Sequence, residues 1–353
     1  MSLRFTSPSD FQRRLLADPT LFAHEIDLIK ELVLFVHLSR EDYQRASFLD
    51  GRIITPNTQG AWMRFHELDA ALAGAERARP VHFIFHSGHV GSTLLSRLLD
   101  ATGAVLGIRE PACLRTLADA ADNVDQPDSL VSPQRFEALV DAQVALWSRG
   151  YPDTLATVVK TTSTASRLAP VLLDKAPNAR ALFLSLRAEP YMAALLSGEN
   201  SIVDLRGHGP SRMRRLRNYG EPGRPLHTLS AGELAAMAWT VETLTHAHVR
   251  ETYRVRTLAL DFDDVLQDVE ATLRRICAHL QLPASAPDIS QAAQDPILSR
   301  YSKDPGAAYS AQTRAARLEH ARRTHAEEIT RGTKWLEAFA ARNARAEAIL
   351  ATA

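Results

Sequence analysis

Residues 81–100, VHFIFHSGHVGSTLLSRLLD, decide the fold of this chain. They begin with an apolar run, pass through a turn that contains Gly88 and Gly91, and continue with Ser92 and Thr93 at the start of a leucine-rich helical stretch. A strand, a glycine turn and a helix N-terminus direct unpaired N–H groups and the positive end of the helix dipole at one point. The stretch therefore predicts a phosphate site built by Gly88, Gly91, Ser92 and Thr93. The alternative is a glycine turn that only joins a strand to a helix.

Four further apolar runs follow residue 100 and alternate with helical stretches. The runs occupy residues 104–108, 154–160, 181–186 and 256–262, and the helical stretches include 136–147 and 269–282. Short apolar runs separated by helices are typical of a parallel sheet that is buried on both faces. We expect an α/β fold of the three-layer P-loop type over residues 80–353, with its core at 81–305 and helices over 306–353.

Two regions depart from this alternation. Apolar residues between positions 8 and 38 recur at helical spacing, which predicts an N-terminal helical extension over residues 1–79. Residues 198–225 are rich in glycine and proline and carry six arginines against three acidic residues. A connection of this length predicts a functional loop, which could serve as a lid or as an acceptor wall, or a solvated surface loop.

The overall composition excludes several classes of protein. The 353 residues hold 41 Lys and Arg and 41 Asp and Glu, so the net charge is zero and there is no global field for binding long nucleic acid. Cys113 and Cys277 both lie in apolar contexts and are expected to be free thiols. No apolar segment is long enough to span a membrane and the first residues do not resemble a secretion signal, so we expect a cytoplasmic protein.

Histidines near the glycine turn do not predict a metal site. His82, His86 and His89 are spaced by four and three residues across the boundary between strand and turn, which does not direct three imidazoles at one centre. The C-x-x-C and H-E-x-x-H patterns are absent. We therefore expect no metal ion.

The turn lacks two residues of the motif that binds nucleoside triphosphates, and this limits which phosphate compound it could bind. A P-loop that hydrolyses a nucleoside triphosphate has the pattern G-x-x-x-x-G-K-[ST], and its lysine contacts the β- and γ-phosphates. Here the first glycine position is His86 and the lysine position is Ser92. A P-loop kinase or NTPase remains an alternative only if another cation replaces that lysine, for which Lys160 is the candidate.

The turn resembles the 5′-phosphosulfate loop of the sulfotransferases that use 3′-phosphoadenosine 5′-phosphosulfate (PAPS). That loop is usually written [KR]-S-G-[ST]-[ST], often followed by Leu-Leu, and residues 89–95 read HVGSTLL. The resemblance implies that Gly91, Ser92 and Thr93 bind the 5′-phosphosulfate. It also implies that His89 stands in the position of the basic residue.

Two segments at predicted strand ends resemble catalytic segments of the same family. Residues 157–162, TVVKTT, match a segment that ends in V-K-T-H, which implies that Lys160 contacts the transferred group and leaves Thr162 in place of the catalytic histidine. A threonine cannot act as a base near neutral pH. Glu110, in the IREP segment 108–111, matches the position from which many bacterial members supply a glutamate base, and it is the candidate base. The alternative is a structural pairing of Glu110 with an arginine such as Arg109 or Arg115.

Two later segments resemble the region that binds the 3′-phosphate. Residues 181–197 contain a strand followed by an arginine and a helix with a serine, which implies roles for Arg187 and Ser197. Residues 300–305, RYSKDP, lie where the family has a basic closing loop, which implies a role for Lys303. The matches together cover residues 81–305.

The resemblance implies a sulfotransferase that transfers a sulfuryl group from PAPS to a hydroxyl or amine and releases 3′,5′-adenosine bisphosphate (PAP). Glu110, His89 and Lys160 would be catalytic, and no metal would be required. The partner would be a small-molecule or peptide acceptor, with an anionic acceptor as one alternative. A non-catalytic nucleotide-binding protein with a degenerate sulfotransferase fold remains a second alternative to the enzyme.

Overall fold

The computed structural model describes residues 8–219, 224–283, 285, 287–301, 304–308, 310–344 and 347–348. Its strands form a three-stranded, a five-stranded and a two-stranded sheet within these residues. The strands are β1 Leu21–Asp27, β2 Leu32–His37, β3 Gly60–Arg64, β4 Val81–His86, β5 Val105–Arg109, β6 Ala156–Lys160, β7 Ala181–Ser185, β8 Thr257–Asp261, β9 Arg300–Tyr301 and β10 Asp304–Ala308.

The helices are α1 Pro8–Ala17, α2 Arg40–Arg45, α3 Phe65–Leu72, α4 Ser92–Ala101, α5 Cys113–Ala121, α6 Pro133–Trp147, α7 Ala169–Lys175, α8 Ala188–Leu196, α9 Ser201–Gly207, α10 Gly209–Arg217, α11 Ala231–Thr252, α12 Phe262–Gln267, α13 Val269–His279, α14 Ile289–Ala292, α15 Ala311–Thr324 and α16 Ala326–Ala340. Short 3-10 turns include η1 Gly51–Ile53, after α2, and η2 Ser163–Leu168, after β6. None of the helices in the described ranges is both long enough and apolar enough to cross a bilayer.

The five-stranded sheet confirms the predicted α/β class. Its order is β5-β6-β4-β7-β8 and all neighbouring strands are parallel, so each of the five apolar runs expected as strands forms one. The carboxyl ends of all five strands therefore lie at one edge of the sheet. Ligands of open α/β sheets bind at this edge.

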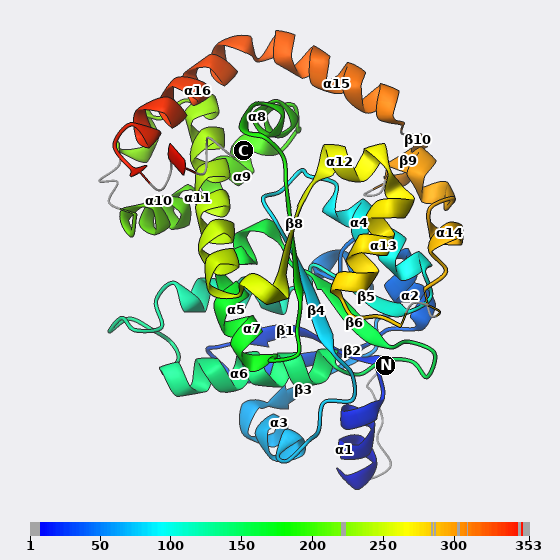
Figure 1. Cartoon of the computed structure of the whole chain (residues 1–353). Coiled ribbons are helices and arrows are strands. Elements are labelled where there is room, and N and C mark those ends of the chain that lie inside the picture. Colours follow the sequence, from blue (N-terminus) through cyan, green and yellow to red (C-terminus); the bar gives the residue numbers. More distant parts are fainter. Residues whose placement is uncertain are drawn as a thin grey trace.

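Both faces of the sheet are buried under helices. Along β4, Phe83 and Phe85 belong to one apolar cluster and Ile84 belongs to the other, as the alternation of side chains along a strand requires. Helices α4 and α13 cover one face, and α5, α6 and α7 cover the other (Figure 1). Helices α15 and α16 then pass over the carboxyl edge of the sheet (Figure 1).

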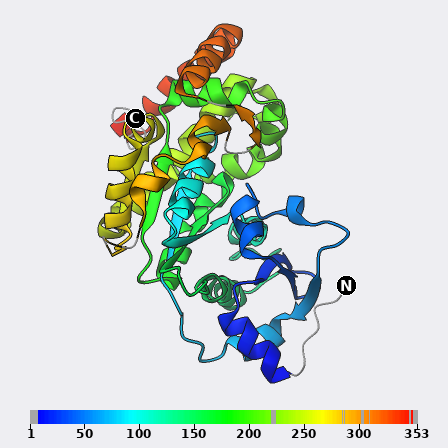
Figure 2. The same cartoon turned by 90° about the vertical axis from the view of Figure 1, so that its right-hand side faces the viewer.

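The N-terminal region corrects the prediction of a helical extension. Only α1 and two short helices form, and β1, β2 and β3 build an antiparallel sheet that packs beside the helices of the larger sheet (Figure 2). The turn between β1 and β2 has no glycine or proline to mark it. Asp27 instead accepts hydrogen bonds from the N–H groups of Ile29 and Lys30, and Glu31 adopts a left-handed conformation. The apolar spacing that predicted a helix therefore belongs to a hairpin.

The arginine-rich region 198–225 is also more ordered than predicted. Its described residues form α9 and α10, which follow each other directly. Leu205 and Leu216 are buried, and Arg212 pairs with Asp204 at 3.1 Å across the two helices. Burial of these side chains stabilises both helices, although the glycines and Pro210 of this region disfavour helix formation.

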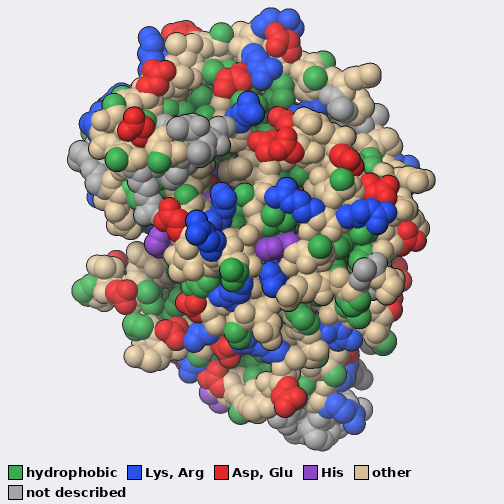
Figure 3. Space-filling model, viewed as in Figure 1, with side chains coloured by type: hydrophobic (Ala, Val, Ile, Leu, Met, Phe, Trp, Pro, Cys, Tyr) green, Lys and Arg blue, Asp and Glu red, His purple; other side chains and the backbone are tan. Residues whose placement is uncertain are grey.

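Side chains of both charges are mixed over the surface. On the face shown in Figure 3, Lys and Arg alternate with Asp and Glu, and no large area carries one sign. Cys113 and Cys277 are buried free thiols, as expected.

Candidate functional site

The turn after β4 brings three left-handed residues together. Gly88, His89 and Gly91 have φ angles of 95°, 55° and 70°. Left-handed backbone is accessible to glycine at little cost but strains a residue such as His89. Gly91 is the N-cap of α4, so the turn leads directly into the helix.

Gly91 is required for a second reason, because an aromatic ring lies against its backbone. A Cβ atom at this position would come within 2.0 Å of the ring of Phe262, the first residue of α12. Phe262 thus closes one side of the turn at a point where only glycine fits.

The N-terminus of α4 carries donors without an acceptor. Gly91 provides no side-chain cap, so the first N–H groups of this ten-residue helix have no intrahelical partner. The Thr93 hydroxyl is buried, with only 1% of the residue exposed, and makes no hydrogen bond. A buried hydroxyl without a partner is costly. An anion in front of α4 would satisfy these groups.

A cavity of about 160 Å³ lies in front of this helix end. Its polar lining residues come from β4, from the turn and helix that follow β4, from the ends of β5 and α8, and from the C-terminal region. They are His86, His89, Ser92, Thr93, Glu110, Ser197, Arg300, Arg314 and Arg317. The structure thus brings together His89, Gly91, Ser92, Thr93, Glu110 and Ser197, all of which were predicted from the sequence.

His86 ends β4 and is held in one orientation. The Gly88 N–H donates to His86 Nδ1 at 3.1 Å, so the hydrogen of the neutral ring is on Nε2, which donates to the Thr161 carbonyl at 2.8 Å. His86 Nε2 lies 4.0 Å from Glu110 Oε1. The imidazole therefore connects the turn after β4 to the end of the neighbouring strand β6.

Glu110 and Lys160 form an ion pair at the carboxyl ends of β5 and β6. Lys160 Nζ donates to Glu110 Oε1. Lys160 is completely buried and does not line the cavity, whereas Glu110 does. The structural partner of Glu110 is thus a lysine and not one of the arginines considered from the sequence. Glu110 also has a left-handed φ of 49°, a strained backbone of the kind that collects at functional sites.

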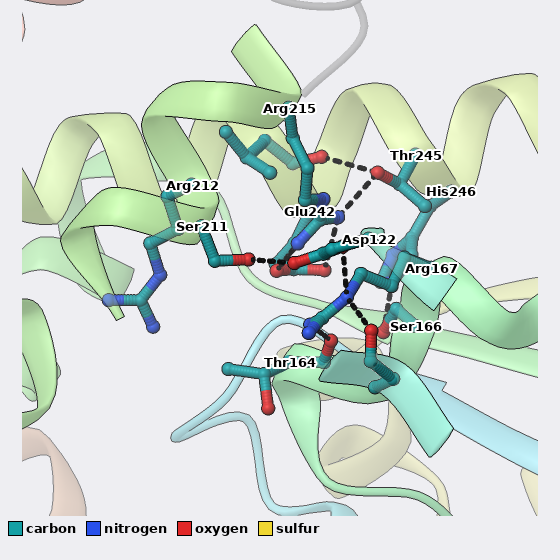
Figure 4. Close-up of polar contacts among 12 residues, drawn as sticks. Asp122, Thr164, Ser166, Arg167, Ser211, Arg212, Arg215, Glu242, Thr245 and His246 are labelled. Carbon is teal, nitrogen blue, oxygen red and sulfur yellow. Dashed lines mark hydrogen bonds and ion pairs between the residues drawn. The ribbon is translucent and has the colours of Figure 1, made fainter. Parts of the chain in front are cut away.

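A buried polar network supports the turn η2 that follows Lys160 and Thr162. Arg215 of α10 donates to Glu242 of α11 at 2.7 and 3.1 Å, and His246 Nε2 lies 3.3 Å from the Ser166 hydroxyl (Figure 4). Arg167 pairs with Asp122 at 2.8 Å (Figure 4). These contacts join α10 to α11 and fix η2 against α11 and the end of α5. They thereby support Ser163, which lies beside Gly88.

Burial controls the ionisation of this network. Burial lowers the pKa of His246 to about 4, so the ring is neutral near pH 7 although the Glu242 carboxylate favours its charged form. Burial alone would raise the pKa of Glu242, but the charge and hydrogen bonds of Arg215 lower it below its ordinary value.

Arginines of α15 complete the cavity and were not predicted as site residues. Arg314 pairs with Asp263 at 2.5 Å and lies 5.2 Å from the ring centre of Phe262, the residue that covers Gly91. Arg317 lines the same cavity. The sequence shows them only as charges on a basic amphipathic helix more than 200 residues after the turn. Their position depends on the path of α15 over the sheet.

Gly88 and Arg187 were also predicted as site residues, but they do not line this cavity. Gly88 lies in the turn beside Ser163. Arg187 is the N-cap of α8 and lines a neighbouring groove of about 890 Å³, which shares Leu318 with the cavity. Lys303 lies outside the described residues. Within the described ranges, no group of three or more His, Cys, Asp or Glu side chains could hold a metal ion.

Comparisons with known proteins were made against family models, curated proteins and solved structures. The model of the sulfotransferase family matches residues 83–286. No curated protein matches.

Three solved structures are similar to the chain at low identity. The sulfotransferase domain from the curacin biosynthetic pathway is 14% identical, with a TM-score of 0.38 over 69% of this chain and 98% of that one. The sulfotransferase domain of the Synechococcus PCC 7002 olefin synthase is 15% identical, with a TM-score of 0.36 over 69% and 95%. Sulfotransferase STF9 from Mycobacterium avium is 12% identical, with a TM-score of 0.40 over 91% and 97%. The family model matches more than half of the residues of this chain, so this chain belongs to the sulfotransferase family.

Proposed function

We propose that the protein transfers a sulfuryl group from PAPS to a hydroxyl or amine of an acceptor and releases PAP. The observation that carries this proposal is the donor-rich N-terminus of α4, with the buried, unpartnered Thr93 hydroxyl facing a cavity that Glu110 also lines. These groups fit an anionic sulfuryl donor. They lack the P-loop lysine on which nucleoside triphosphate hydrolysis depends.

Each group at the cavity has a role in this proposal. Gly91, Ser92 and Thr93 bind the 5′-phosphosulfate, and His89 neutralises charge at its bridging oxygen. Arg187 binds the 3′-phosphate from the neighbouring groove and Ser197 binds it from the cavity. Lys303 is retained from the sequence as a further ligand of that phosphate. Arg314 and Arg317 supply further positive charge from α15.

The Glu110–Lys160 pair couples proton transfer to charge stabilisation. PAPS supplies the sulfuryl group, whose bond to the 5′-phosphate oxygen breaks as the acceptor oxygen or nitrogen bonds to sulfur, and PAP leaves with the electron pair. Glu110 accepts the acceptor's proton, which neutralises the carboxylate. The positive charge of Lys160 is then no longer balanced by a carboxylate. It stabilises the negative charge that develops on the leaving phosphate at the same time.

Thermal shift tests the donor. We expect PAP to raise the melting temperature of the protein without magnesium, while ATP with magnesium does not. Stabilisation by ATP and magnesium alone would refute the PAPS proposal and favour a kinase or NTPase.

Release of labelled PAP from PAPS in the presence of an acceptor panel separates an enzyme from a nucleotide-binding protein. Binding of PAP with no release for any acceptor would support the non-catalytic alternative.

A further inference from the structure

The segment between α2 and η1 lies directly beside Glu110. The Leu49 N–H donates to the Arg109 carbonyl at 2.6 Å, and the Ala112 N–H donates to the Leu49 carbonyl at 3.3 Å. The buried Arg109 guanidinium donates to the Ala46 carbonyl at 2.8 Å. Residues 46–52 are therefore fixed at the carboxyl end of β5, although they lie outside the region that matches the family model.

Phe48 of this segment lies close to two cations. Lys160 Nζ is 5.7 Å from the centre of its ring, and the guanidinium carbon of Arg52 is 3.6 Å from it. Cations at these distances are attracted to an aromatic ring. Phe48 thus places Arg52 next to the ion pair that contains the candidate base.

Arg52 shares one carboxylate with a second arginine. Arg52 donates to Asp50 at 2.8 and 2.7 Å, and Arg115 of α5 donates to the same Asp50 at 3.3 Å. Burial alone would raise the pKa of Asp50, but the hydrogen bonds and charges of the two arginines lower it. Asp50 is buried, while Arg52 and Arg115 are each about half exposed, so two accessible cations are balanced by one buried anion.

Three of the arginines of α10 pair with acidic side chains. Their partners are acidic side chains of α9, of α11 and of the residue after α5. The pairs are Arg212 with Asp204 at 3.1 Å, Arg214 with Asp122 at 3.5 Å and Arg215 with Glu242 at 2.7 Å. Arg212 and Arg215 thus each have a carboxylate that they share with no other arginine, whereas Arg52 and Arg115 share Asp50.

Space for a ligand is available beside Arg52. A groove of about 540 Å³ is lined by Arg52 and by polar residues of the N-terminal region, among them Asn57, Thr58 and Gln59. The charge of Glu110 acts on Arg52, so an anionic group that binds Arg52 in this groove would lie near the candidate base.

We propose that Arg52 and Arg115 form the acceptor subsite of this enzyme and bind a carboxylate, sulfate or phosphate group of the acceptor. Asp50 positions both guanidinium groups, and Phe48 sets the position of Arg52 relative to Glu110. The natural acceptor is therefore an anionic hydroxy or amino compound. This inference rests on the proposed sulfuryl transfer at Glu110.

Matched pairs of phenols that differ only in charge provide the test. The probes are 4-hydroxybenzoate, 4-hydroxyphenylacetate and 4-hydroxycinnamate, each compared with its carboxamide, and binding is measured by titration calorimetry with and without saturating PAP. We expect at least one carboxylate to bind about tenfold more tightly than its amide, and we expect Arg52→Gln and Arg115→Gln to remove that preference.

Arg40→Gln is the control, because it removes a cation of the same region that pairs with Asp153 at 2.7 Å. This variant should retain the preference for the carboxylate, and melting temperatures establish that all variants fold. The proposal is wrong if no carboxylate is preferred over its amide or if the preference survives in the double variant Arg52→Gln/Arg115→Gln. If the wild-type protein does not bind PAP, the proposal that PAPS is the donor is wrong. Binding of the phenols without PAP is measured independently of the donor, so the two failures can be distinguished.

Discussion

Lys160 and Glu110 form a buried ion pair that joins the carboxyl ends of two neighbouring parallel strands. Glu110 faces the cavity in front of α4, and Lys160 lies behind it, where solvent does not reach. Loss of one partner from a buried pair leaves an uncompensated charge, which is more costly than loss of both.

The pair can be tested by a double-mutant cycle. Lys160→Met should lower the free energy of unfolding by about 3 kcal/mol, and Glu110→Gln in that background should recover part of the loss. Urea denaturation measures both effects. Additive losses in the double variant would show that the two side chains do not interact.

Glu110→Gln alone tests the catalytic role. If Glu110 accepts the proton, the variant should bind PAP normally but turn over about 100-fold more slowly. Near wild-type turnover would assign Glu110 a structural role.

The Thr93 hydroxyl should contribute to nucleotide binding and not to folding. Because the buried hydroxyl has no partner, Thr93→Val should leave the stability of the free protein unchanged or raise it, yet weaken PAP binding about tenfold. Ser96→Ala is the matched control, since Ser96 is equally buried and unpartnered on α4 but does not line the cavity. Calorimetric titration with PAP should show a change for Thr93→Val only.

Gly91 should be intolerant of a side chain because of both its conformation and its neighbour. Gly91→Ala places a methyl group against Phe262, and we expect a loss of about 3 kcal/mol in stability. Gly103→Ala is the control, because Gly103 has a similar φ of 72° but open space around its Cβ position, and it should cost about 1 kcal/mol. Equal losses in the two variants would show that contact with Phe262 is unimportant.

His246 should make stability fall as the pH is lowered. The pKa of the folded ring is about 4 and its ordinary value is 6.5, so between these values the unfolded chain binds a proton that the folded protein excludes. Stability is therefore lost as the pH falls from 6.5 towards 4, and at pH 5 this one group accounts for about 2 kcal/mol.

Unfolding in urea at pH 7 and pH 5 measures this effect. The loss between the two pH values should be smaller by about 2 kcal/mol in His246→Gln than in the wild type. His248→Gln, at an exposed position of the same helix, should behave like the wild type. An unchanged loss in His246→Gln would show that other groups carry the pH dependence.

The parallel sheet and the glycine turn after β4 could be predicted from the amino-acid sequence alone. Continuous apolar runs such as 81–85 and 181–186 satisfy a strand buried on both faces, and the conformations needed at Gly88 and Gly91 are local properties. The sequence did not determine the N-terminal sheet, because the spacing of its apolar residues satisfies a helix as well as a hairpin whose turn lacks glycine.

The identity of the distant residues that complete the site depends on the tertiary structure. Arg314 and Arg317 line the same cavity as the turn after β4 because α15 crosses the carboxyl edge of the sheet, and Arg52 lies near Arg115 because both pair with the buried Asp50. The Glu110–Lys160 pair depends on the adjacency of β5 and β6. These contacts depend on packing between segments far apart in the chain, so local patterns of residues carry no signal for them.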